Sequence, residues 1–153
     1  MSEAIRYRRA KFATRLLGDR LYTAGHAWLA EESPGLWRIG LTKFAIRMLG
    51  EAVELDFEIR PGAAIEKGDV LGWIEGFKAV TDLYSPLGGV FHGQNDELLA
   101  DPELLKKDPF GRGYLYRVEG RPDEDCVDVQ GYVAILDATI DKMLGESGGA
   151  DNE

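Results

Sequence analysis

The sequence predicts a mainly β fold, a barrel or a sandwich, with one short helix after the first strands and one amphipathic helix near the carboxyl end. Short apolar stretches of strand type recur from residue 21 to residue 118. Turn residues of the Pro-Gly and Gly-Gly kind separate them at short intervals, which is typical of barrels and sandwiches. The chain has 153 residues, which fit one domain large enough to bury a core without disulfides.

The first pair of strands is predicted at residues 28–30 and 36–39, on either side of the turn signal Ser33-Pro34-Gly35. Thr42 can then cap a short helix over residues 43–49, which ends at Gly50. Helical spacing predicts that the core face of this helix is formed by Phe44, Ala45, Met48 and Leu49.

A half-buried strand is predicted over residues 53–59, where apolar residues alternate with acidic ones. Pro61-Gly62 then turns the chain towards a hairpin. The two strands of this hairpin are predicted at residues 70–74 and 80–84, and Lys78 lies at its tip.

The predicted hairpin ends at Ser85-Pro86, because proline cannot donate to a central ladder. Gly88-Gly89 allows a tight bend before a strand with Val90 and Phe91. Residues 96–107 are expected to be helical in two pieces that are interrupted at Pro102. A last strand and a terminal amphipathic helix are predicted from Tyr114, Tyr116 and Val118, and from Val133, Leu136, Ile140 and Met143 or Leu144, with Gly145 as the helix stop.

Charge is divided unevenly along the chain, which has a net charge of −9 and a pI near 4.8. Residues 1–20 carry a net +4 and the remainder carries −13. We expect residues 1–20 to form a basic arm in solvent, residues 21–145 to form the single domain, and residues 146–153 to form a flexible tail. The acidic body argues against nucleic acid as a partner, since phosphates would be repelled, and suits docking to basic patches on partner enzymes.

Several kinds of chemistry have no signal in this sequence. No apolar run reaches bilayer length and no secretory signal is recognisable, so we expect no membrane contact. Cys126 is the single cysteine, which excludes an internal disulfide and a multi-cysteine metal site, and the expected compartment is the cytoplasm. His26 and His92 lie too far apart in sequence to make a convincing metal set. Acidic neighbours should raise the pKa of the Cys126 thiol, so we expect no nucleophile there and no catalytic residues.

Lys78 is the strongest candidate functional residue. Two apolar runs of near-equal length flank it, so its amine is expected to be held in solvent on a rigid base. Proteins present an amine in this way for covalent attachment of a carried cofactor such as lipoamide or biotin. The alternative interpretation is an ordinary surface lysine that only solubilises the protein.

Four groups of residues carry a resemblance to a known family, over about residues 21–118. They are Tyr22-Thr23 with His26 and Trp28; Ile39-Gly40-Leu41-Thr42 with Phe44-Ala45 and Leu49-Gly50; Gly68, Glu75, Lys78-Ala79-Val80, Asp82, Ser85-Pro86 and Gly89; and Asn95, Leu98, Pro102, Leu105, Pro109, Gly113 and Leu115. In this order they resemble the glycine cleavage H-protein family of lipoyl carriers. Biotin carriers usually place the lysine between methionines, and lipoyl domains of 2-oxoacid dehydrogenases match the hairpin only.

The resemblance implies a β-barrel-sandwich hybrid of the lipoyl- and biotinyl-carrier type over residues 21–145. It implies lipoate in amide linkage to Lys78, with Glu75, Ala79 and Asp82 around the attachment site. It also implies a non-catalytic carrier, loaded by a lipoate-attaching enzyme, that raises the effective concentration of its cargo at each active site. The implied partners are a pyridoxal-phosphate glycine decarboxylase, an aminomethyltransferase that takes the aminomethyl group, and dihydrolipoyl dehydrogenase.

Some positions depart from the family pattern. His26-Ala27-Trp28 stands where the family has His-Glu-Trp, and Gly25 occupies a serine position. In the family, the serine and glutamate side chains at these two positions help to hold the aminomethylated arm in a surface cleft, where a carboxylate pairs with the amine. Asp82 matches the other acidic residue of that cleft. Gly76-Phe77 replaces the more usual Ser-Val before the lysine. Two alternatives therefore stay open: an H-like lipoyl carrier in another pathway, such as sulfur oxidation or lipoate relay, and an unlipoylated interaction module.

Overall fold

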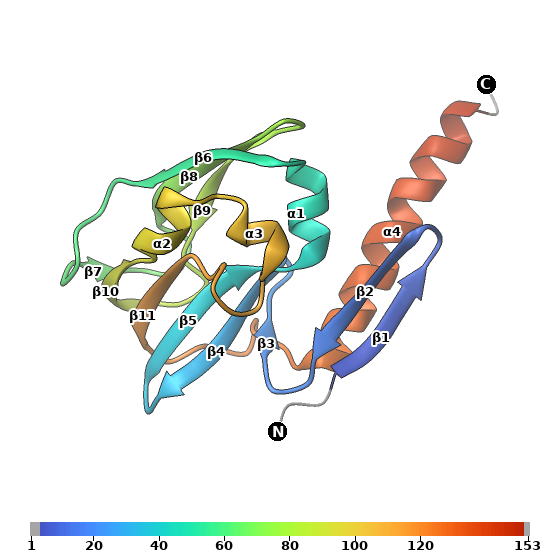
Figure 1. Cartoon of the computed structure of the whole chain (residues 1–153). Coiled ribbons are helices and arrows are strands. Elements are labelled where there is room, and N and C mark those ends of the chain that lie inside the picture. Colours follow the sequence, from blue (N-terminus) through green and yellow to red (C-terminus); the bar gives the residue numbers. More distant parts are fainter. Residues whose placement is uncertain (1–3, 152–153) are drawn as a thin grey trace.

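The computed structural model describes the backbone of residues 4–151 and the side chains of residues 4–145. Within that range the chain forms eleven strands and four helices (Figure 1). In chain order they are β1 (Ala4–Arg9), β2 (Phe12–Leu17), β3 (Leu21–Tyr22), β4 (Ala27–Ser33), β5 (Leu36–Leu41), α1 (Lys43–Leu49), β6 (Ala52–Phe57), β7 (Ala64–Ile65), β8 (Val70–Gly76), β9 (Val80–Tyr84), β10 (Gly89–Gln94), α2 (Asp96–Ala100), α3 (Leu104–Lys107), β11 (Tyr116–Gly120) and α4 (Val129–Asp151).

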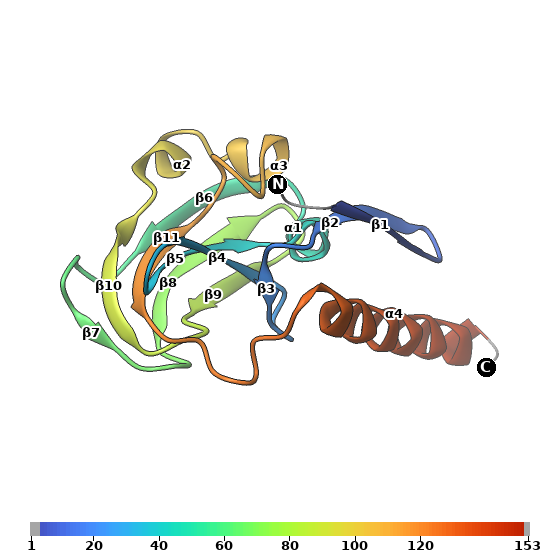
Figure 2. The same ribbon diagram turned by 90° about the horizontal axis from the view of Figure 1, so that it is seen from below.

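Two antiparallel sheets enclose the main core. One has the strand order β3-β4-β5-β11-β10-β7 and the other has the order β6-β8-β9. Apolar side chains of both sheets meet in one buried cluster, with Leu29 and Phe91 from the first and Leu55 and Ile74 from the second. Figure 2 shows the strands curving around this core. The predicted β-barrel-sandwich hybrid is confirmed.

The predicted helices and strands mostly lie where the turn residues indicated, with two local differences. Thr42 occupies the position before α1, but its hydroxyl does not cap the helix and bonds instead to the Tyr132 hydroxyl at 2.7 Å. Val53, expected on the core side of its strand, is exposed. A register shift between Ala52 and Glu54 breaks the alternation there, because a bulge changes which side chains face inward.

The amino-terminal segment corrects the expectation of a solvated basic arm. β1 and β2 pair as an antiparallel hairpin in which Arg6 lies opposite Arg15. On the other face of this hairpin, Tyr7, Phe12 and Leu16 are buried. The basic residues dominate the composition of the segment, but the period of two places Arg6, Arg8 and Arg15 outward and the buried apolar residues inward. The segment is therefore packed structure with a basic outer face.

Helix α4 corrects the predicted helix end at Gly145. Its backbone continues through that residue to Asp151, and Gly145 does not adopt a positive φ. A glycine inside a helix costs about 1 kcal/mol relative to alanine, but ends the helix only where the backbone turns left-handed. Residues 152–153 of the expected tail lie outside the described residues, and the domain boundaries at residues 20 and 145 stay predictions.

No helix in the described part is both long and apolar enough to span a membrane.

The first hairpin and α4 are tied to each other by polar contacts. The Tyr7 hydroxyl donates to the Asp137 carboxylate at 2.8 Å. The Arg9 guanidinium binds the Asp141 carboxylate through two hydrogen bonds of 2.8 Å. Together the hairpin and α4 form an extension beside the barrel, visible at the right of Figure 1. Its apolar residues join side chains of the barrel in a second buried cluster that consists of Tyr7, Phe12, Leu16, Tyr22, Trp28, Phe44, Tyr114, Tyr132, Leu136 and Ile140.

Candidate functional site

Lys78 lies at the tip of the β8–β9 hairpin, as predicted. The Gly76 amide donates to the Ala79 carbonyl at 2.8 Å and closes the turn. Lys78 is exposed, and the neighbouring Phe77 is 77% exposed. Both side chains at the tip are therefore accessible from solvent.

The tip is held against the carboxyl end of α1. The Lys78 amide donates to the Leu49 carbonyl at 2.9 Å, and the Phe77 amide donates to the Glu51 carbonyl at 3.0 Å. The first of these bonds uses the Leu49 carbonyl, which has no partner inside the helix because it belongs to the last helical turn. The Lys78 ammonium reaches back to the Arg47 carbonyl at 3.4 Å, where the helix dipole favours a cation. The lysine is thus presented on a fixed base.

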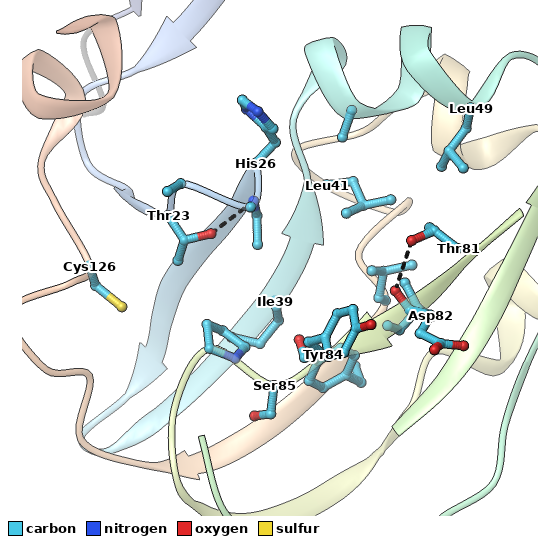
Figure 3. A pocket seen from close by; sticks show the side chains of 18 of the residues that line it. Thr23, His26, Ile39, Leu41, Leu49, Thr81, Asp82, Tyr84, Ser85 and Cys126 are labelled. Carbon is cyan, nitrogen blue, oxygen red and sulfur yellow. Dashed lines mark hydrogen bonds between the residues drawn. The ribbon is translucent and has the colours of Figure 1, made fainter. Parts of the chain in front are cut away.

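A cleft of about 710 Å³ opens on the β9 side of this hairpin (Figure 3). Its walls come from β9, from the turn before β4, from β5, from the end of α1, from the turn before β8, from the start of β11 and from the segment before α4. The lining is mostly apolar and consists of Thr23, Ala24, Gly25, His26, Ala27, Ile39, Leu41, Ala45, Met48, Leu49, Lys67, Ala79, Thr81, Asp82, Leu83, Tyr84, Ser85, Pro86, Leu115, Tyr116, Asp125 and Cys126.

The cleft brings together some of the predicted site residues and leaves others outside. Ala79 and Asp82 line it, whereas Glu75 and Lys78 do not. Glu75 lies on β8 opposite Val80, on the approach to the tip. The sites of family departure, Gly25 and Ala27, also line the cleft, so their small side chains leave that wall without a carboxylate.

His26 connects the cleft to the carboxyl-terminal helix. It adopts a positive φ of 67° in the turn before β4. Its Nδ1 is hydrogen bonded to the Tyr132 hydroxyl at 2.9 Å, and that hydroxyl also contacts Thr42. Burial lowers the pKa of His26 below its ordinary value, so the neutral ring is favoured. Tyr132 is stacked on Tyr22 with ring centres 4.7 Å apart, which fixes this network in the second core.

A cluster of charged residues closes one end of the cleft. The Lys67 ammonium bridges the Asp123 carboxylate, at 2.8 Å, and the Asp125 carboxylate. Cys126 follows directly, and the pKa of its thiol is raised by burial and by the charges of Asp123 and Asp125. The predicted direction of that shift is confirmed, so the thiol stays protonated near neutral pH and is a poor nucleophile.

Sequence reasoning missed most of the cleft walls. Ile39, Leu41 and Met48 were interpretable only as core residues, because nothing in their spacing shows that they border a cavity. Tyr132 lies on the predicted amphipathic face, but no sequence signal links it to a histidine 106 positions earlier. Within the described residues, no three His, Cys, Asp or Glu side chains gather closely enough to hold a metal ion.

The mainly β fold, the exposed lysine on a fixed hairpin tip and the apolar cleft beside it are the arrangement expected of a carrier protein. A family model described as glycine cleavage H-protein matches residues 20–136. The chain belongs to the glycine cleavage H-protein family, whose members are carrier subunits of the glycine cleavage system.

Individual relatives agree with this assignment. The glycine cleavage system H protein of Pseudoalteromonas atlantica is 34% identical over 120 residues, covering 78% of this chain and 88% of that protein. The one from Pectobacterium carotovorum is 33% identical over 119 residues, covering 76% and 91%. The crystal structure of a glycine cleavage system H protein from Mycobacterium marinum superposes with a TM-score of 0.70 at 31% identity, over 78% of this chain and 97% of that one.

Proposed function

We propose that this chain is the lipoyl carrier of a glycine cleavage system, with lipoate in amide linkage to Lys78. The observation that carries the proposal is the exposed Lys78 amine on a tip that is hydrogen bonded to α1, next to an apolar cleft. Loading requires an amine that a lipoate-attaching enzyme can reach, and the exposure of Lys78 meets that requirement. Glu75 and Asp82 flank the tip on the two strands and present carboxylates to that enzyme.

The residues of the chain bind and orient, and perform no catalysis. When bound, lipoate would supply a disulfide that a pyridoxal-phosphate glycine decarboxylase reductively aminomethylates. The dithiol left after an aminomethyltransferase removes the group would be reoxidised by dihydrolipoyl dehydrogenase. The apolar walls of the cleft, Ile39, Leu41 and Met48 among them, exclude water from a cargo that enters. The Asp82 carboxylate is placed to pair with a protonated amine there. The proposed compartment is the cytoplasm, because a lone protonated thiol is compatible with a reducing environment.

Peptide mass spectrometry on protein from its native cells tests the proposal. We expect a lipoyl adduct on Lys78, and we expect Lys78→Arg to abolish glycine-dependent methylene transfer with the three partner enzymes while leaving the fold intact. Arginine keeps the cation beside the Arg47 carbonyl, so lost transfer would not reflect a lost contact. A bare Lys78 in cells that lipoylate other proteins would contradict the proposal and favour an unlipoylated interaction module.

A second function, lipoyl carriage in another pathway, is favoured by the missing carboxylate in the cleft wall at Ala27 and Gly25. Ala27→Glu should place a carboxylate there and speed aminomethyl transfer by about tenfold if one added charge-assisted hydrogen bond stabilises the bound amine by about 1.5 kcal/mol. Ala100→Glu, at an exposed position on α2 that does not line the cleft, is the matched control for added charge. No gain with Ala27→Glu would count against the interpretation of Ala27 as a handicap, and would remove the observation that favours the second function.

A further inference from the structure

A second, smaller apolar groove lies between the turn of the first hairpin, α1 and the second half of α4. Its volume is about 200 Å³. Phe12 and Phe44 meet edge to face within it, with ring centres 5.3 Å apart. Ile140, Met143 and Leu144 of α4 add an aliphatic wall. Met143 is 41% exposed and Leu144 is 52% exposed, so this wall is open to solvent.

Lys78 does not line the groove, but it contacts a residue that does. The lining of the groove on α1 includes Arg47 and Met48, and the Lys78 ammonium donates to the carbonyl of Arg47. From Arg47 back to Phe44 the helix rises only about 5 Å, at 1.5 Å per residue. An acyl chain with a terminal ring is longer than one helical turn, so an arm attached to Lys78 can lie along this face of α1.

Met48 lies on the border between the two cavities, since it lines both the large cleft and the groove. One small rotation of an attached arm about the end of α1 therefore moves it from one apolar surface to the other. The groove is also built largely by the extension, because its contributions from β1–β2 and from the second half of α4 lie outside the residues 20–136 that match the family.

We propose that this groove is a second binding site for the lipoyl arm on Lys78, separate from the cleft. The proposal rests on the proposed lipoylation. After acylation, the side-chain nitrogen of Lys78 is an uncharged amide that keeps one proton for the Arg47 carbonyl, which directs the base of the arm along α1. The apolar acyl chain and dithiolane then cover Met143 and Leu144, which are otherwise exposed. An arm at rest there leaves the cleft empty.

Methyl NMR with ¹³C-labelled methionine tests this inference, because Met143 lines only the groove and Met48 lines both cavities. The full chain is compared before and after loading by a lipoate-attaching enzyme, and mass spectrometry verifies the adduct. Met143→Leu assigns the signal. We expect loading to shift both the Met143 and the Met48 methyl resonances, and to shift neither in Lys78→Arg treated in the same way.

A blocking variant separates contact from indirect effects. Leu144→Arg places a charge in the groove at a half-exposed position, and should abolish the Met143 shift on loading. Val53→Arg, at a position that is 46% exposed and borders neither cavity, should retain it. A shift of Met48 alone would place the arm in the cleft and overturn the inference, as would no shift at all. A Lys78 that cannot be loaded would refute the proposed function, and the inference with it.

Discussion

At the scale of single residues, the presentation of Lys78 depends on Gly76. A Cβ on this residue would lie 2.2 Å from the Leu49 carbonyl oxygen and 2.8 Å from its carbon, both part of the backbone at the end of α1. The close approach lets the Lys78 amide bond to that same carbonyl. Glycine stands here in place of the more usual serine, and its lack of a side chain leaves room for the tight contact between the hairpin and α1.

Gly76→Ala should therefore push the tip away from α1. We expect a loss of about 1–3 kcal/mol in the free energy of unfolding, the usual cost of overpacking, measured by urea denaturation. Slower lipoylation should accompany it, because the base of Lys78 loses its fixed position. Gly25→Ala is the control, since its added Cβ comes no closer than 3.8 Å to the Thr23 hydroxyl. Equal effects of both substitutions would contradict the role assigned to the contact.

His26 makes stability depend on pH. Burial lowers its pKa in the folded chain below the ordinary value near 6.5, so the unfolded chain takes up a proton at a pH where the folded chain does not. The stability that the neutral ring contributes is therefore fully present when the pH is above this ordinary pKa. It is lost progressively as the pH falls from there to the folded pKa, below which the loss is constant.

His26→Asn tests this dependence, because asparagine tolerates the positive φ and can still bond to the Tyr132 hydroxyl. We expect the fall in unfolding free energy on acidification to be smaller in this variant than in the parent chain, by equilibrium denaturation at a series of pH values. An identical fall in both proteins would show that His26 is not responsible.

At the scale of elements, the extension depends on a hairpin that is half apolar. Leu16 is 1% exposed, whereas its neighbour Leu17 faces the other way and is only partly buried. Leu16→Ala should cost about 2–5 kcal/mol in unfolding free energy or detach the hairpin, with faster tryptic cleavage at Arg15. Leu17→Ala should cost clearly less. Equal cleavage rates for the two variants and the parent would mean that the segment is a solvated arm after all.

Sequence patterns predicted most of the barrel elements because these have a local signal, whereas the two-residue strand β7 was missed. Gly50 ends α1, Pro102 separates α2 from α3, and alternation predicted β6. The hairpin of β1 and β2 was missed because Arg6, Arg8 and Arg15 outweigh the apolar residues between them in composition. The apolar residues of this hairpin are buried against α4, which comes more than a hundred residues later in the chain. Contacts between segments so far apart leave no local sequence pattern.

Part of the candidate site could likewise be predicted from local sequence, and part of it could not. The hairpin flanking Lys78 and its exposure follow from neighbouring residues, so they could be predicted. The cleft could not, since its walls come from seven separate segments of the chain and their apolar side chains resemble core residues. The register shift that exposes Val53 is likewise a property of the pairing of β6 with β8, and no residue type at that position indicates it.

At the scale of the whole molecule, charge is segregated. The outer face of the first hairpin presents Arg6, Arg8 and Arg15, with Lys11 at its turn, all exposed, on a chain with a net charge of −9. Arg6 and Arg15 face each other across the strands, an arrangement that costs stability. The first hairpin therefore presents a basic face on a molecule that is acidic as a whole.

This asymmetry should give weak retention on a cation-exchange resin near neutral pH and low salt, against the sign of the net charge. Arg6→Glu should abolish the retention, because it breaks the basic face. Lys106→Glu changes the net charge equally, but at an exposed position on α3, and should leave retention nearly unchanged. Equal losses in the two variants would show that net charge alone decides.

The pairing of the hairpin with α4 also orders events during synthesis. The residues that Tyr7 and Arg9 bind lie 130 and 132 positions further along the chain. At about 5–20 residues per second, the ribosome therefore leaves the apolar face of the hairpin uncovered for several seconds after it emerges. The barrel strands are complete before α4 exists. A lipoate-attaching enzyme that meets the nascent chain therefore encounters Lys78 before the groove on α1 has formed.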